Sequence, residues 1–195
     1  MVDCRAQTFT LEAAITTLLI VLVMLYISQA IPLTPLTSSA ANVMVENTLE
    51  MYAGDVLNTL TYEPICSDIS AENLSILKKA LLSWNGAVID GGASSSEYDT
   101  SFENISNALP LKYVLINAFE KKGLAYNIDI YYKDAIMRKL RFIYNGQPSN
   151  NAIIATQVIP IYDTDYENGI KKYIPDIDSS NLYNVLYVRL TVWRM

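Results

Sequence analysis

Residues 5–31 read RAQTFTLEAAITTLLIVLVMLYISQAI, and this stretch decides the first element of the fold. Its last nineteen residues, 13–31, carry no charge. At about 1.5 Å per residue, a helix of that length matches the roughly 30 Å hydrocarbon thickness of a bilayer. Its β-branched residues weaken a helix in water, but a lone segment in lipid can satisfy its backbone only as a helix. The run therefore predicts a membrane-length helix.

The charges around this run predict its orientation. Arg5 precedes the run, and the next Lys or Arg along the chain is Lys78. Cytoplasmic flanks of membrane helices are enriched in Lys and Arg. We therefore expect a single pass through the cell membrane, with the amino terminus cytoplasmic and the carboxyl-terminal part outside.

Three interpretations of the amino end are open at this point. In the first, a secretory signal peptide ends at the small residues of 28–30, although Asp3 and Glu12 leave its leader without net positive charge. In the second, the run is an uncleaved anchor. In the third, a short leader is removed ahead of the run, and this interpretation follows from a resemblance.

Two short motifs carry that resemblance. Residues 5–8, Arg-Ala-Gln-Thr, resemble a class III, or prepilin, signal, which a dedicated membrane peptidase cuts after a small residue. Residues 9–12, Phe-Thr-Leu-Glu, resemble the opening of the type IV pilins. The likeness implies that a leader at 1–6 is removed by cleavage between Ala6 and Gln7.

The resemblance also implies how the rest of the chain is used. Residues 7–31 would anchor the subunit in membrane lipid and later pack in the core of a filament, and residues 32–195 would form an extracellular domain. Assembly would involve Phe9, Leu11 and Glu12, with Glu12 meeting the new amino terminus of a neighbour. Glu12 would be the sixth mature residue, whereas the family carries its glutamate at the fifth. The implied partners are copies of itself or related pilins, the prepilin peptidase and the pilus assembly machinery.

The carboxyl end carries a second likeness. Residues 148–152, 158–163 and 183–193 are similar to an archaeal pilin-like family that opens with Gln-x-Phe-Thr-Leu-Glu and ends in a Val-Trp strand. This likeness implies an archaeal origin and a structural class, and it assigns no specific task.

Composition excludes several classes of function. The net charge of −6 in 195 residues argues against a nucleic-acid surface, which needs clustered Lys and Arg. The chain has no histidine, which removes the usual general base of hydrolases and the commonest zinc ligand. Loss of Cys4 with a leader would leave Cys66 alone, and the acidic residues of 163–178 lack the pattern of a calcium loop. We therefore expect no enzyme, no cofactor and no metal.

Periodicity predicts the remaining elements. Apolar spacing and capping residues predict helices after the membrane run, and alternation predicts a hairpin and two further strands in the carboxyl-terminal half. The expected fold class is α+β: an amino-terminal transmembrane or filament-core helix, then helices packed on one face of a small antiparallel sheet, as in pilins. The expected helices cover 40–60, 70–84 and 110–122, the expected loop 90–96, and the expected strands 125–132, 137–144, 152–161 and 183–193.

Two further features suggest contacts outside the cell. Asn73 and Asn104 begin Asn-x-Ser sequons, which makes them possible sites of N-glycosylation. The chain also has 14 tyrosines, and several fall on expected strands, where aromatic residues cover a half-buried sheet. We interpret the tyrosines as structural in the main, with an adhesive face as the alternative.

These observations lead to one expected function and one alternative. We expect a structural subunit, a major or minor pilin-like protein, of an archaeal type IV pilus-like surface filament. The alternative is a single-pass anchored extracellular module that never polymerises and binds a ligand on the sheet or on the loop of residues 91–101.

Overall fold

The structure is a computed structural model that describes residues 4–30, 40–62, 74–165, 169–177 and 181–195. For residues 4–8, 10, 27–30 and 40–42 it describes the backbone alone. The chain divides into two compact units, Met1–Val43 and Met44–Met195, and each is described by itself.

The first unit contains helix α1, Cys4–Ala30. The hydroxyls of Thr16 and Thr17 donate to the carbonyls of Glu12 and Ala13, at 2.8 and 2.7 Å, so these polar groups are satisfied within the helix. A helix was predicted over 7–31, and α1 covers nearly all of that range. In the part of the chain described with its side chains, no helix is both long and apolar enough to cross a membrane. The membrane role of α1 therefore stays a prediction.

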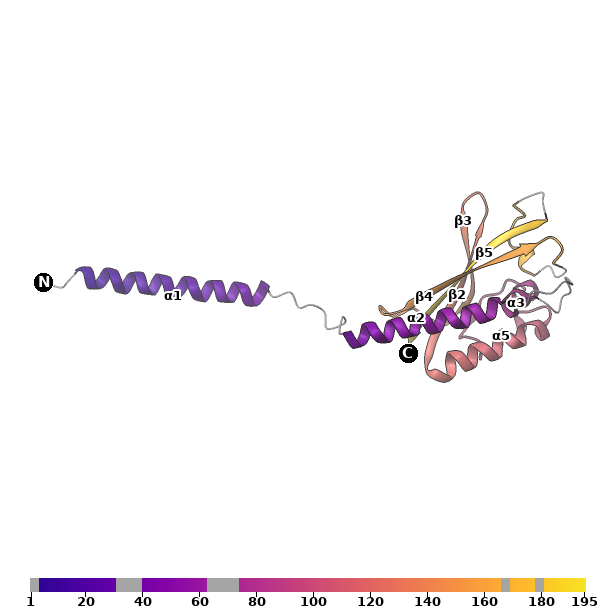
Figure 1. The fold of residues 1–195 in the computed structure, drawn as a ribbon, viewed down its shortest axis with the longest axis horizontal. Coiled ribbons are helices and arrows are strands. Elements are labelled where there is room, and N and C mark those ends of the chain that lie inside the picture. The colour runs from indigo at the N-terminus through magenta and orange to yellow at the C-terminus, as the bar shows by residue number, and fades with distance from the viewer. Residues whose placement is uncertain (1–3, 31–39, 63–73, 166–168, 178–180) are drawn as a thin grey trace. The chain divides into compact units, whose positions relative to one another are not determined.

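The second unit is an α+β domain built on a five-stranded sheet (Figure 1). The strand order is β1-β3-β2-β5-β4, and β5 lies between β2 and β4. All neighbouring strands run antiparallel except β1, which pairs with β3 in parallel, so the sheet is mixed and the prediction of an antiparallel sheet was incomplete. The strands are β1 Ile89–Asp90, β2 Leu124–Lys133, β3 Met137–Tyr144, β4 Ile153–Tyr162 and β5 Leu182–Arg194.

The period-two pattern explains the sheet's core. In β5 the alternate residues Leu186, Val188, Leu190 and Val192 are fully buried, because they point to the helix-covered face. The predicted hairpin is confirmed: β2 and β3 pair antiparallel, with Lys133 opposite Met137 at the closed end.

Helices α2 Ala40–Thr61, α3 Ile76–Ser83 and α5 Ile105–Ala118 gather on one side of the sheet (Figure 1). Their apolar stripes meet the buried strand residues in one core, to which Leu57, Leu81 and Leu115 contribute from the three helices. Short helices join these elements: α4 Ser96–Thr100, η3 Glu120–Lys122 and η4 Ile170–Lys172.

The predicted helix over 70–84 differs from α3 at its start. The Ser75 hydroxyl caps α3 by accepting the Lys78 amide at 3.3 Å, so α3 begins at Ile76. Residues 70–73 lie outside the described residues. The helix ends at Ser83, because Trp84 leaves the helical conformation and forms a bridge with Phe102.

The predicted helix over 110–122 was wrong at its start, and its predicted end is correct in place but is a separate 3-10 turn. Asn104 caps α5 by accepting the Ser106 amide at 3.2 Å, so α5 starts earlier and Pro110 lies inside it. Its α-helical hydrogen bonding ends at Ala118, and a 3-10 turn follows that Gly123 closes with a φ of 68°. The predicted loop of 90–96 was also incomplete, since α4 begins at its last residue.

Candidate functional site

The residues predicted for processing and assembly all lie on the first turns of α1. Ala6 and Gln7 fall within its helical backbone, and their side chains are outside the described part. Phe9, Leu11 and Glu12 have exposed side chains. The structure thus gathers the predicted residues at one helix end.

The apolar side chains of α1 are exposed in every direction. Twelve large apolar side chains between Phe9 (72% exposed) and Tyr26 (75% exposed) are more than half exposed. The nine residues of 18–26 are all among them, and nine consecutive helical residues point to all sides of the axis. A helix that is apolar all round is typical of a buried or lipid-embedded helix.

Two shallow hollows follow the surface of α1. Ala13, Ala14, Thr17, Leu18 and Val21 line one of them, and residues between Leu19 and Tyr26 line the other. The first is floored by small residues, which allow a second helix to approach closely.

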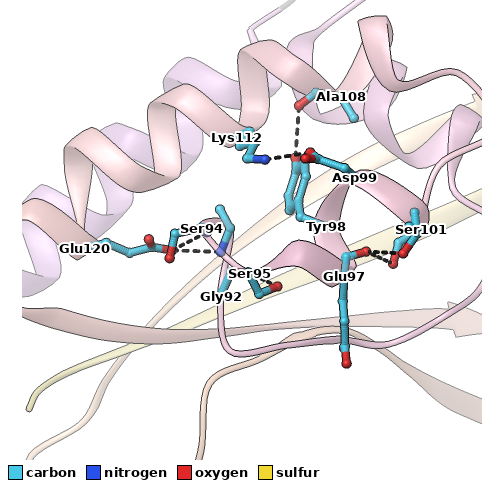
Figure 2. A network of polar contacts seen from close by, with 12 residues as sticks. Gly92, Ser94, Ser95, Glu97, Tyr98, Asp99, Ser101, Ala108, Lys112 and Glu120 are labelled. Atoms are coloured by element: carbon cyan, nitrogen blue, oxygen red, sulfur yellow. Dashed lines mark hydrogen bonds and ion pairs between the residues drawn. The ribbon is translucent and has the colours of Figure 1, made fainter.

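A polar network ties the loop of residues 91–101 to the rest of the domain (Figure 2). The Glu120 Oε1 atom accepts the backbone amides of Ala93 at 2.7 Å and Ser94 at 3.3 Å. It also accepts the hydroxyl of Tyr126 at 2.8 Å. One carboxylate, at the start of η3, therefore fixes both the loop and strand β2.

The other end of the loop is held through α4. The hydroxyl of Tyr98 donates to the carbonyl of Ala108 in α5 at 2.9 Å, and Lys112 pairs with Asp99 at 2.6 Å (Figure 2). Tyr98 is fully buried, and burial raises the pKa of its hydroxyl above the ordinary tyrosine value. Burial, and then the charge of Glu120, raise the pKa of Tyr126 in the same direction.

These hydrogen bonds argue against the loop of residues 91–101 as a ligand-binding site. The polar groups that face the network already have partners within the domain, and the turn is compact at Gly92, where φ is 83°. A Cβ atom at Gly92 would lie 2.7 Å from the Glu120 Oε1 atom and would displace it from its hydrogen bonds, and the positive φ also favours glycine. These contacts support a structural role for the loop, in which Glu120 holds it against strand β2.

A buried ion pair joins α3 to the chain after β4. The Lys78 Nζ atom lies 3.3 Å from the Asp165 Oδ2 atom, and both side chains are almost fully buried. The same carboxylate oxygen accepts the amide of Tyr162 at 2.8 Å. The pair fixes the position of the loop that follows β4.

The remaining predicted residues fall in different places. Asn73 and Cys66 lie outside the described residues, whereas Asn104 is exposed at the start of α5. Within the described ranges, no group of three or more Cys, Asp or Glu is placed to hold a metal ion. Of the tyrosines on the strands, Tyr126 and Tyr132 are buried, and Tyr187 is 40% exposed.

Sequence reasoning missed Glu120, Tyr126 and Lys78 as organising residues. The adjacent glycines of the loop were a signal for a tight turn, but they do not indicate which carboxylate approaches it. The predicted helix around Lys78 is otherwise apolar on its buried side, and a lysine in such a stripe is a signal for a buried partner.

Comparisons with known proteins place the chain in a family. A comparison with curated proteins and a comparison with solved structures each found no match. A family of unknown function, DUF7288, matches residues 5–192. Because this match includes the apolar helix and nearly all of the α+β domain, the chain belongs to the family of unknown function DUF7288.

Proposed function

We propose that this protein is a structural subunit of an archaeal surface filament of the type IV pilus kind. In this proposal α1 anchors the subunit in the cell membrane before assembly and packs against copies of itself or of related pilins afterwards. The α+β domain of residues 44–195 then faces the outside of the cell. The membrane step rests on the uncharged run of residues 13–31.

The exposed apolar surface of α1 is the observation that carries the proposal. Burying one large apolar side chain is worth about 1.5–3 kcal/mol, so covering the twelve on α1 is worth on the order of 20 kcal/mol. Soluble monomers rarely leave such a contiguous apolar surface in water. Lipid covers such a helix in a membrane, and neighbouring helices cover it in a filament core.

The hollow lined by Ala13, Ala14 and Thr17 supports helix packing in particular. Ridges of one helix fit into grooves of another, and small residues deepen those grooves.

Glu12 has a defined part in this proposal. Its carboxylate lies near the amino-terminal end of an otherwise apolar helix, and a carboxylate packed among apolar helices needs a cation. Cleavage after Ala6 creates a positively charged amino group on Gln7 of each subunit. We propose that Glu12 of one subunit pairs with that group of its neighbour.

The mass of the amino-terminal peptide of the native protein tests the proposal, taken separately from membranes and from sheared surface filaments. A peptide that begins at Gln7 in the sheared fraction supports both processing and assembly. A peptide that begins at Met1, found in membranes alone, contradicts the filament and favours a simple anchored module. A peptide that begins at Ile31 indicates a secreted soluble protein.

A substitution tests the role of α1 directly. Leu19→Lys places a charge at the middle of the apolar run, where it costs several kcal/mol in a bilayer. We expect the variant to lose membrane retention and filament formation. Tyr113→Lys, at an exposed side chain of α5, is the matched control and leaves both unchanged. Normal filaments in the Leu19→Lys strain would contradict the proposal.

The alternative proposal is a single-pass anchored binding module. The partly exposed tyrosine on the uncovered face of the sheet, Tyr187, favours it, because aromatic side chains are enriched at binding surfaces. The two proposals predict different amino-terminal peptides, so the same measurement separates them.

A further inference from the structure

One face of the sheet has no helix on it. The helices α2, α3 and α5 gather on the other face (Figure 1). On the uncovered face, Tyr131 of β2 lies opposite Tyr187 of β5, and Asp129 lies opposite Arg189. Tyr187 is exposed and Arg189 is half-buried, so this face presents aromatic and charged groups together.

Strand β3 adds one residue to each of these two cross-strand pairs and so makes two rows across the sheet. Lys139 lies opposite Tyr131, and Arg141 lies opposite Asp129. The rows therefore hold three cations and one carboxylate, a net charge of +2, on a chain whose net charge is −6. The basic sheet face is defined here as Asp129, Tyr131, Lys139, Arg141, Tyr187 and Arg189.

The carboxylate of the basic sheet face, Asp129, pairs with a lysine and not with an arginine. The Asp129 Oδ2 atom lies 2.7 Å from the Lys139 Nζ atom, and among the described residues no ion pair joins Asp129 to Arg189. Arg141 lies over the ring of Tyr144, 4.3 Å from its centroid. Arg189 reaches the Tyr131 hydroxyl at 3.4 Å, and its buried Nε atom has no hydrogen-bond partner among the described residues. A buried donor without an acceptor is destabilising, and it is completed when a partner brings one.

Protection of the sheet edge explains only part of this charge. Cations on an exposed edge strand prevent unwanted strand pairing, and beyond its short pairing with β1 the strand β3 is an edge. That argument accounts for Lys139 and Arg141. Arg189 lies on β5, which is hydrogen-bonded on both sides, so edge protection does not account for it.

The chain itself carries a complementary surface on α2. The helix holds Glu46, Glu50 and Asp55 and no Lys or Arg among its 22 residues. It packs through buried residues such as Leu57, while Glu50 and Asp55 are exposed. Because α2 belongs to the helix layer, its carboxylates lie on the opposite side of the sheet from the basic sheet face (Figure 1). The two surfaces therefore meet only between copies.

We propose that the basic sheet face of one copy binds the acidic helix α2 of a second copy. Glu50 and Asp55 supply acceptors to Arg189 and Arg141, and Tyr131 and Tyr187 supply the apolar contact area around these pairs. Two different surfaces are joined, so the contact is head-to-tail and repeats from copy to copy. The inference rests on the proposed self-assembly and adds to it a contact between the α+β domains.

Cysteine substitutions in separate copies test this contact. The full chain is used with Cys4 and Cys66 replaced by Ser. One allele carries Thr156→Cys, at the exposed position opposite Arg189 on β4, and a co-expressed allele carries Met51→Cys on the exposed side of α2. Mild oxidation of native membranes and of sheared filaments should give a disulfide-linked dimer.

Matched controls and a charge reversal make the result specific. Tyr113→Cys on α5 replaces Met51→Cys in the control and should give no dimer with Thr156→Cys. Glu50→Lys with Asp55→Lys, added to the Met51→Cys allele, should lower the dimer yield about tenfold. Both substitutions are at exposed helix positions, so the domain keeps its fold.

The outcomes separate this inference from the proposed function. Filaments that form without the dimer overturn the contact and leave the filament proposal intact. A dimer found in membranes of cells that make no filament supports the contact and contradicts the filament. A Thr156→Cys link to a different protein, or a dimer yield that ignores the charge reversal, overturns the contact.

Discussion

The ion pair between Lys78 and Asp165 gives the sharpest test of how the domain is held together. Asp165→Asn keeps the size of the side chain and an oxygen that can accept the Tyr162 amide, but it removes the negative charge. Lys78 is 1% exposed, so its ammonium stays buried while this ion pair is lost. Breaking a buried pair from one side costs about 3–5 kcal/mol, because the buried charge that remains loses the attraction of that partner.

That cost is large for a domain of this size. For a domain near 150 residues, 1 kcal/mol shifts the midpoint of thermal unfolding by about 2–4 °C, so the expected loss is roughly 6–20 °C. Lys78→Met leaves the carboxylate alone and should cost a similar amount. The double variant removes both charges, and we expect it to be at least about 2 kcal/mol more stable than the sum of the single changes predicts.

Urea unfolding of the full chain in detergent, followed by the fluorescence of the buried Trp84 next to α3, measures these free energies. The control pair is Lys112 and Asp99, where Asp99 is 54% exposed. Lys112→Met or Asp99→Asn should cost under about 1 kcal/mol. The reasoning is refuted if Asp165→Asn costs no more than this control, or if the two buried changes are simply additive.

Three further predictions follow from the loop and from α5. Gly92→Ala should lower the free energy of unfolding in urea by about 2–3 kcal/mol, because its Cβ meets the Glu120 carboxylate. Gly123→Ala is also at positive φ but has no atom within 4 Å of its Cβ, so it should cost only about 1 kcal/mol. Equal losses would contradict this account. Burial raises the pKa of Tyr126 above its ordinary value of 10.0, so the stability that its neutral form contributes is complete below about pH 10 and is lost above it. Tyr126 alone should then lower the free energy of unfolding by up to about 1.4 kcal/mol per pH unit above pH 10, and Tyr126→Phe should reduce the total slope by that amount. In sheared filaments, mass spectrometry should find a glycan on Asn104, since the residue is exposed and its helix cap uses only the Oδ1 atom. An unmodified peptide would contradict that prediction.

Much of the fold was predictable because its signals are local. The hairpin of β2 and β3 was expected within a residue at most ends, since alternation and the short polar turn are both properties of neighbouring residues. The second helix was expected over 40–60, and α2 covers Ala40–Thr61. In each case the pattern needs no information from elsewhere in the chain.

The predictions failed for elements whose existence or bounds depend on contacts with distant parts of the chain. Strand β1 is two residues long, and only its pairing with the end of β3 makes it a strand. The start of α5 was placed at Pro110, because proline is favoured in a first turn, but Asn104 supplies the cap one and a half turns earlier. The hydrogen bond of the Asn104 cap decided where α5 starts, and the preference of proline for a first turn did not.

The organising contacts were beyond sequence reasoning for a similar reason. Nothing near Glu120 indicates that it will accept amides from Ala93 and Ser94, because that contact exists only after α5 has packed on the sheet. Asp165 was interpreted as part of a polar loop, and its burial against Lys78 depends on the position of α3. The candidate assembly residues on α1 were named from the resemblance of residues 9–12 to the opening of the type IV pilins, and such a motif is local in the sequence.

The place of β5 in the sheet has a consequence for biosynthesis. Synthesis makes β1 to β4 first, yet β2 and β4 touch each other only through β5, which is made after them. Until the chain has emerged as far as residue 194, the edges of β2 and β4 that β5 pairs with stay unpaired. A prematurely terminated chain would keep its apolar α1 but lack the strand that closes its sheet. Such products should be recognised as unfolded and degraded before they can join other subunits.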